Sequence, residues 1–229
     1  MSIRNQITTI QDTIRRTALG RGRDPESVDL IAVSKKQSLE KIKTAYSCGQ
    51  RVFGENYLQE AREKISACPS DICWHFIGHL QSNKAASAVE LFDVIQTVDR
   101  AKIVKKIQHH AKRIGKRQNI LVQVNVGREK QKSGILPENA EDLLGTIQRQ
   151  PNVQVLGLMT MPPWTDDPEK SRPYFRQLRE LASNLAKKGL FADPDHVALS
   201  MGMSGDYTVA IEEGATMVRV GTAIFGTRL

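Results

Sequence analysis

The chain of 229 residues carries 33 Lys or Arg and 25 Asp or Glu residues, which gives a formal charge of +8. Hydrophobic residues make up 40% and charged residues 25%, which excludes a disordered or collagen-like chain and indicates a folded globular protein. No apolar run approaches the roughly 20 residues of a membrane-spanning helix, and the first residues lack a secretory h-region. The 3 cysteines are too few for a disulfide framework. We therefore expect a cytoplasmic protein without a membrane partner.

Helical and strand-like patterns alternate along the chain. Apolar residues at spacings of three and four predict a first helix from Ile3 to about Gly20. Short apolar runs then predict strands at residues 29–34, 51–53, 74–77, 93–98, 119–126, 153–159, 196–201 and 217–220. Helices are expected between and after them. The first runs from the N-cap Ser38 to Gly49, and the next follows the second strand and runs to about Ala67. The others are expected at 81–89, 99–115, 137–150, 168–189 and 206–213.

This alternation defines the expected fold class. Strands separated by helices form a parallel sheet with helical crossovers. Eight such units in 229 residues favour a closed (β/α)8 TIM barrel with one extra N-terminal helix, and an open doubly wound sheet is the alternative. No linker, low-complexity tract or repeat divides the sequence, so residues 1–229 are expected to form a single domain. In such a barrel the functional side chains lie at the C-terminal ends of the strands.

Lys35 directly follows the first predicted strand. A lysine at the mouth of a barrel is half desolvated, which favours its neutral, nucleophilic amine and suits it to a Schiff base. Lys36 comes next and points the other way if the strand continues. From position alone, a solvated surface lysine is the more common alternative.

The last two strand ends offer an anion site. Ser204 and Asp206 precede a short predicted helix, and the amides at a helix N-terminus, together with a hydroxyl, suit an anion. Gly221 and Thr222 follow the last strand and add another amide and hydroxyl. Loops after the seventh and eighth strands commonly form a phosphate site in these barrels. An ordinary capped helix and a glycine turn are the alternative on spacing alone.

Arg219 lies between two valines in the last predicted strand. A buried charge needs a partner or a ligand. The sequence leaves two interpretations open: a ligand inside the barrel, or a carboxylate in the barrel such as that of Glu55.

Two other groups of residues are discounted. Cys73, His75 and His79 are close in sequence, but no fourth ligand follows at a zinc spacing, so no metal is expected. The stretch 102–117 predicts a helix with a solvated basic face, and RNA contact is the alternative. Its basic residues are Lys102, Lys105, Lys106, Lys112, Arg113, Lys116 and Arg117, and its apolar stripe is Ile103, Ile107, Ala111 and Ile114.

Several motifs follow one another in order over nearly the whole chain. They are Ile31-Ala-Val-Ser-Lys35, Phe53-Gly-Glu-Asn-Tyr57, Trp74-His-Phe-Ile-Gly-His-Leu-Gln-Ser-Asn-Lys84, Lys132-Ser-Gly134, Gly157-Leu-Met-Thr-Met161, Leu199-Ser-Met-Gly-Met-Ser204 and Val218-Arg-Val-Gly-Thr-Ala-Ile-Phe-Gly226. Together they resemble the pyridoxal phosphate homeostasis protein family, relatives of the barrel domain of bacterial alanine racemase. The resemblance implies an alanine racemase N-terminal domain-like barrel.

The resemblance also implies a cofactor and its site. Pyridoxal 5′-phosphate (PLP) would be held as an internal aldimine on Lys35. Its pyridine nitrogen would face Arg219. The remaining contacts would come from Ser204, Gly221 and Thr222 on the phosphate, and from Asn56, Ile77 and Met203 around the ring.

Arg219 bears on the function that the resemblance implies. A cation opposite the pyridine nitrogen disfavours its protonation and weakens the cofactor as an electron sink. Alanine racemase-like enzymes add a tyrosine base from a separate β-domain, and the residues after Gly221 are too few for such a domain. We therefore expect a PLP-binding protein of intracellular PLP homeostasis, which buffers or delivers PLP without robust catalysis.

Other functions remain as alternatives. A PLP-dependent amino-acid racemase or lyase is the second, and an RNA- or acid-binding protein using the basic helix is the third. The tyrosines that can approach the mouth are Tyr57, Tyr174 and Tyr207, and no spacing argument places one opposite Lys35. PLP and the apo-enzymes that need it are the expected partners, and nucleic acid is not. Without a β-domain, a monomer is expected.

Overall fold

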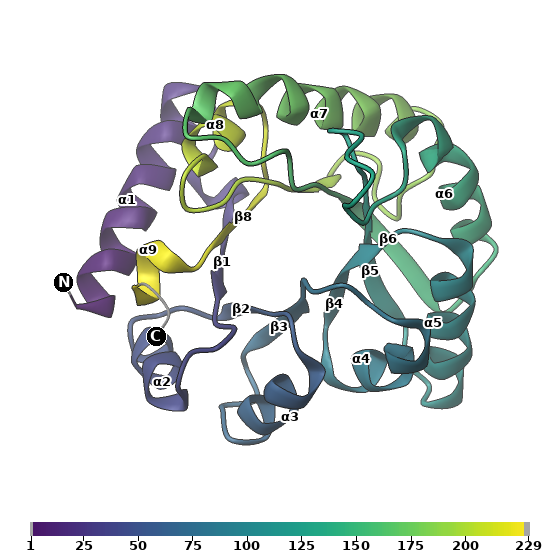
Figure 1. The fold of residues 1–229 in the computed structure, drawn as a ribbon, viewed down its shortest axis with the longest axis horizontal. Coiled ribbons are helices and arrows are strands. Elements are labelled where there is room, and N and C mark those ends of the chain that lie inside the picture. Colours follow the sequence, from purple (N-terminus) through teal and green to yellow (C-terminus); the bar gives the residue numbers. More distant parts are fainter. Residues whose placement is uncertain (1, 227–229) are drawn as a thin grey trace.

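The computed structural model describes residues 2–226. Eight parallel strands form a closed barrel in the order of the sequence, and β8 closes on β1 (Figure 1). The strands are β1 (Asp29–Val33), β2 (Val52–Glu55), β3 (Cys73–Phe76), β4 (Val94–Val98), β5 (Gln118–Gln123), β6 (Val153–Met159), β7 (Ala198–Ser200) and β8 (Met217–Val220). The predicted barrel is confirmed, and every expected strand is present within a few residues of its expected bounds.

Helices surround the barrel (Figure 1). They are α1 (Ile3–Gly20), α2 (Leu39–Ser47), α3 (Leu58–Ser66), α4 (Ala85–Leu91), α5 (Ala101–Arg113), α6 (Ala140–Gln148), α7 (Arg172–Ala186), α8 (Tyr207–Glu212) and α9 (Thr222–Phe225). The short 3-10 turns are Pro25–Ser27, Ser82–Lys84, Pro137–Asn139 and Pro168–Ser171. Helix α9 was not expected, because four residues are too few to show a helical period. Within residues 2–226, no helix is both long and apolar enough to cross a bilayer.

Helix α1 is the extra helix in front of the barrel, and it contacts α2, α8 and α9 (Figure 1). The predicted spacing puts Ile7, Ile10 and Ile14 on its buried face. Helix α2 begins as predicted, because the Ser38 hydroxyl accepts a hydrogen bond from the Lys41 N–H. Local sequence signals therefore fix where these two helices begin and which side they bury.

The strands divide the apolar core into two parts. Outward side chains such as Phe53 and Phe76 pack with the helices in the main core. A smaller cluster of Val94, Leu121 and Met159, on β4, β5 and β6, is separate from that core. Because side chains alternate along each strand, this second cluster lies inside the barrel. The interior also holds polar side chains, which belong to the site described below.

Helix α5 carries most of the basic stretch. Its buried face consists of Ile103, Val104, Ile107 and Ala111. Ile114 is 45% exposed, so its assignment to the apolar stripe was wrong. Lys116 does not belong to the solvated face either, because its ammonium donates to the carbonyls of Val89 and Phe92. Burial lowers the pKa of Lys116. The exposed basic residues are Lys102, Lys105, Lys106, Lys112, Arg113 and Arg117.

Candidate functional site at the barrel mouth

The end of β1 places Lys35 at the mouth of the barrel. Ala32 packs outward with the helices in the main core. Its neighbours Ile31 and Val33 therefore face the interior, because successive side chains of a strand alternate. Lys35 lies two residues beyond Val33, in the turn after β1, and is half-buried. Lys36 is exposed, and its φ of 57° turns the backbone out of the strand.

Two loops on one side of the mouth bring Ser204 and Thr222 together. Their hydroxyl oxygens lie 3.1 Å apart. The loop of Ser204 is folded by a hydrogen bond of 2.7 Å from the Met203 N–H to Asp206 Oδ1. Helix α8 has six residues and α9 has four, so the hydroxyls and loop amides, more than a helix dipole, define this part of the site.

Gly221 lies between this hydroxyl pair and the end of β1, the strand that Lys35 follows. Strand β8 pairs with β1, with Val220 opposite Ala32. A Cβ on Gly221 would lie 3.3 Å from the carbonyl oxygen of Val33, so a larger residue would crowd the end of β1. Lys35 and the two hydroxyls consequently lie beyond the ends of adjacent strands.

Arg219 is buried inside the barrel. Its guanidinium donates to the Ser200 hydroxyl at 2.6 Å and to the Thr160 carbonyl at 2.8 Å. Burial lowers the pKa of Arg219 to about 10, although the charge of Asp206 acts in the opposite direction. The side chain is therefore a cation at neutral pH, held in place by neutral acceptors.

The pairing of Arg219 with Glu55, one of the two interpretations of the sequence, is wrong. Glu55 Oε1 accepts hydrogen bonds from Ser34 Oγ at 2.6 Å and from Lys64 Nζ at 2.7 Å. Glu55 shares a face of β2 with Phe53, which packs against the helices. Its carboxylate therefore points away from the barrel interior.

A chain of polar side chains crosses the interior behind Arg219. The Ser200 hydroxyl donates to Gln96 Oε1 at 2.6 Å, and Gln96 Nε2 lies 2.7 Å from His75 Nδ1. Strands β7 and β4 are not neighbours, so the bond between Ser200 and Gln96 spans the interior. Burial lowers the pKa of His75 to about 4, so the neutral ring accepts from Gln96. Sequence reasoning missed Gln96 and Ser200, although a polar residue inside a buried strand was the signal for each.

Asn56 and Ile77 follow β2 and β3 at the mouth. The side-chain Oδ1 of Asn56 is buried and has no hydrogen-bond partner among the described residues. A Cβ on Gly78 would lie 2.2 Å from the Asn56 carbonyl oxygen. The residues after β2 and β3 can therefore lie this close together only because position 78 is a glycine. The Ile77 side chain packs against β2, because its Cδ1 lies 3.0 Å from the position that a Cβ on Gly54 would take. A buried acceptor without a partner is costly, and a polar group of a ligand relieves that cost.

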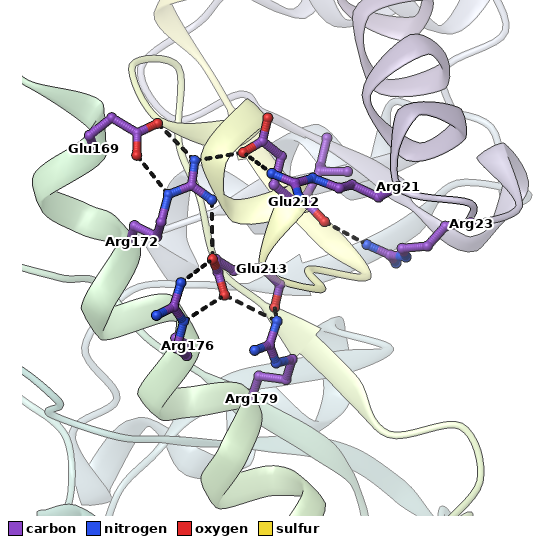
Figure 2. A network of polar contacts seen from close by, with 9 residues as sticks. Arg21, Arg23, Glu169, Arg172, Arg176, Arg179, Glu212 and Glu213 are labelled. Atoms are coloured by element: carbon purple, nitrogen blue, oxygen red, sulfur yellow. Dashed lines mark hydrogen bonds and ion pairs between the residues drawn. The ribbon is translucent and has the colours of Figure 1, made fainter.

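Arginine–glutamate contacts hold α8, the helix after the Ser204 loop (Figure 2). The carboxylate of Glu213 is surrounded by three arginines, Arg172, Arg176 and Arg179, at 3.1, 3.1 and 3.0 Å. Glu212 pairs with Arg172 and with Arg21, which follows α1. These contacts tie the C-terminal end of α8 to α7 and to the residue that follows α1.

The two histidines of the Cys73, His75 and His79 group contact different residues. His75 contacts Gln96, whereas His79 Nδ1 lies 3.0 Å from the Ser133 hydroxyl. Burial raises the pKa of the Cys73 thiol to about 11, which keeps it protonated. Within residues 2–226, no three His, Cys, Asp or Glu side chains are arranged to hold a metal ion.

Comparison with known proteins first defines a class. The family model described as "Alanine racemase, N-terminal domain" matches residues 15–229. The alanine racemase of Corynebacterium glutamicum is 16% identical, with a TM-score of 0.71 over 95% of this chain and 61% of its own, a likeness of fold alone. The barrel with a lysine beyond its first strand is thus of the alanine racemase N-terminal type.

Relatives with higher sequence identity define the family within this class. The pyridoxal phosphate homeostasis protein of Aquifex aeolicus is 42% identical over 100% of this chain and 99% of its own. That of Escherichia coli K12 is 39% identical over 99% of this chain and 97% of its own. PipY of Synechococcus elongatus, solved with PLP bound, is 37% identical, with a TM-score of 0.80 over 93% of this chain and 100% of its own. The chain belongs to the pyridoxal phosphate homeostasis protein family.

Proposed function

We propose that this protein binds PLP at the barrel mouth and serves intracellular PLP homeostasis, buffering or delivering the cofactor without robust catalysis. The observation that carries the proposal is the convergence at one mouth of a half-buried lysine, a buried cation and a pair of hydroxyls. The names of the curated relatives and the PLP bound in PipY support it.

The residues at the mouth fit the chemical groups of PLP. PLP brings a phosphate, a pyridine nitrogen, a ring hydroxyl and an aldehyde that condenses with a primary amine and releases water. Lys35 supplies that amine, and Arg219 faces the pyridine nitrogen. The phosphate is bound by Ser204, Gly221 and Thr222, and the ring is lined by Asn56, Ile77 and Met203. The buried Oδ1 of Asn56, which has no partner among the described residues, is consistent with a polar ligand at this place.

The charge of Arg219 supports a carrier over a catalyst. Arg219 is a buried cation at neutral pH, and a cation opposite the pyridine nitrogen disfavours its protonation. The bound cofactor is then a weak electron sink, so removal of a proton from an amino acid is slow. Racemisation also requires a second base on the opposite face.

The described tyrosines give little support for such a base. Tyr57 is the residue before α3 and is 49% exposed, and Tyr174 and Tyr207 pack partly against the main core. We propose that one barrel domain acts as a monomer in the cytoplasm, and that PLP-dependent apo-enzymes receive the cofactor from it. Neither nucleic acid nor a membrane is a proposed partner.

The first experiment is a visible spectrum of the purified protein incubated with PLP, before and after borohydride, followed by peptide mass mapping. We expect a yellow band that borohydride bleaches, with the reduced cofactor attached to Lys35. A protein that stays colourless would contradict the proposal. A cofactor attached mainly to another lysine would contradict the assignment of Lys35.

A further inference from the structure

A buried ion network lies on the outer side of the end of β1, just before Lys35. It consists of Glu55 at the end of β2 and of Glu60 and Lys64 on α3. Glu55 is fully buried and Lys64 is 6% exposed. Lys64 Nζ donates to Glu55 Oε1 at 2.7 Å, to Glu60 Oε1, and to the Ser34 carbonyl at 2.6 Å. An ammonium has three donors, so all three are used.

This network holds the backbone on both sides of Lys35. The Ser34 carbonyl belongs to the peptide group just before Lys35, and it accepts from Lys64. The Lys36 N–H belongs to the peptide group just after Lys35, and it donates to Glu60 Oε1 at 2.6 Å. Both peptide groups that set the direction of the Lys35 side chain are therefore bonded to the same ion pair.

The arrangement is costly for the fold. Burying an ion pair removes both charges from water, and an apolar replacement of similar volume is often as stable. Glu55 Oε2 is buried without a partner among the described residues, and burial raises the pKa of Glu55, against the opposing effect of Lys64. Lys36 also adopts a left-handed backbone conformation that non-glycine residues disfavour. The costly ion pair is bonded to the peptide groups on both sides of Lys35, and the disfavoured backbone conformation is at the next residue, which favours a role in placing that side chain.

We propose that Lys64 and Glu60 are positioning residues, which hold the peptide groups flanking Lys35 so that its amine meets the PLP aldehyde. The inference rests on the proposed function, because it assigns these residues a role in PLP attachment. Lys64 and Glu60 lie on the outer side of the strand end and act only through the backbone of residues 34–36.

Glu60 is the better position for the test. Its side chain is 27% exposed, and without it Lys64 still pairs with Glu55, so the fold should persist. Glu60→Ala removes the acceptor of the Lys36 N–H. Glu60→Gln keeps an acceptor oxygen in a side chain of the same shape. Glu63→Ala is the matched control, because Glu63 is an exposed glutamate on the same helix.

Two measurements are made on each variant. In the apo-protein, NMR measures hydrogen exchange of the Lys36 amide. In the loaded protein, transfer of PLP to an excess of a trapping amine gives the dissociation rate, and borohydride mapping gives the lysine to which PLP is attached. We expect Glu60→Ala to accelerate both exchange and dissociation by about tenfold or more, the effect of losing a hydrogen bond to a charged group. Glu60→Gln should recover most of both rates, and Glu63→Ala should match the wild type.

The outcomes separate this inference from the proposed function. If the wild type attaches PLP to Lys35 and Glu60→Ala loses PLP at the wild-type rate, the positioning role is overturned and the proposed function stands. If Glu60→Ala only lowers the melting temperature and leaves both rates unchanged, Glu60 is merely structural and the inference is again overturned. If the wild type does not attach PLP to Lys35, the proposed function fails and this inference fails with it.

Discussion

The Arg219 guanidinium donates a hydrogen bond of 2.6 Å to the Ser200 hydroxyl, and Ser200 in turn donates to Gln96 on the far side of the barrel. The Ser200 hydroxyl thus accepts a hydrogen bond from a cation and donates its single proton to the amide oxygen of Gln96. This relay fixes the plane of the guanidinium inside the barrel. It also gives a neutral partner to a charge that has little access to water.

Replacing Ser200 should destabilise the protein. Ser200→Ala removes the acceptor of a buried cation and the donor to Gln96, so we expect a loss of about 2 kcal/mol in the free energy of unfolding. Urea denaturation measures the change. Ser66→Ala, at an exposed serine of α3, is the control and should change little. Equal stability of the two variants would contradict the importance of the relay.

The proposed phosphate contacts are tested by removing the two hydroxyls. Ser204→Ala and Thr222→Ala should each weaken retention of PLP, because a hydrogen bond to a charged group contributes roughly 1.5–3 kcal/mol. The fold should stay intact, since neither side chain is fully buried. Equilibrium dialysis measures the affinity and circular dichroism the fold. Unchanged affinity in the double variant would mean that the phosphate binds elsewhere.

Catalysis is tested by exchange of the α-proton of amino acids in deuterated water. We expect only slow exchange, because the Arg219 cation, in its proposed place opposite the pyridine nitrogen, would keep the bound cofactor a weak electron sink. Proton NMR follows the loss of the α-proton signal. Rapid, saturable exchange that disappears in Lys35→Ala would establish a catalyst, and the racemase or lyase alternative would then replace the carrier.

The Glu213 network should make the fold sensitive to acid. Burial alone raises the pKa of Glu213, but the hydrogen bonds of Arg176 and Arg172 and the nearby positive charges outweigh it and leave the pKa below its ordinary value. A carboxyl group with a lower pKa in the folded state contributes stability above its unfolded pKa, and this contribution is lost as the pH falls through the folded pKa. Stability should therefore fall below about pH 4.5.

Glu213→Gln tests this contribution. We expect a loss of about 2 kcal/mol at pH 7 and a flatter dependence on pH between 5 and 3 than in the wild type. Urea midpoints over this pH range measure both effects. Glu141→Gln is the control, because Glu141 forms an exposed pair with Lys188 and should contribute little. The same pH dependence in wild type and Glu213→Gln would show that other groups control acid unfolding.

Local patterns were sufficient to predict most of the elements. The isoleucines of α1 and the cap at Ser38 act over a few residues, so the sequence alone shows them. The helix α9 was missed for the same reason, because it is too short to have a period. The Glu55 interpretation failed although a local signal was present: Phe53 and Glu55 share one face of β2, and an aromatic side chain on that face predicts contact with the helices.

The sequence by itself determined the order of strands and helices, the position of Lys35 beyond the first strand and the motifs that resemble a PLP-binding family. Only the tertiary structure decided which distant residues meet. Ser200 reaches Gln96 across the barrel, and Lys64 reaches both the Ser34 carbonyl and the Glu55 carboxylate, because closure and strand register bring these groups together. Periodicity is a property of neighbours in the chain, whereas these contacts join residues separated by 9 to 104 positions, so no local pattern encodes them.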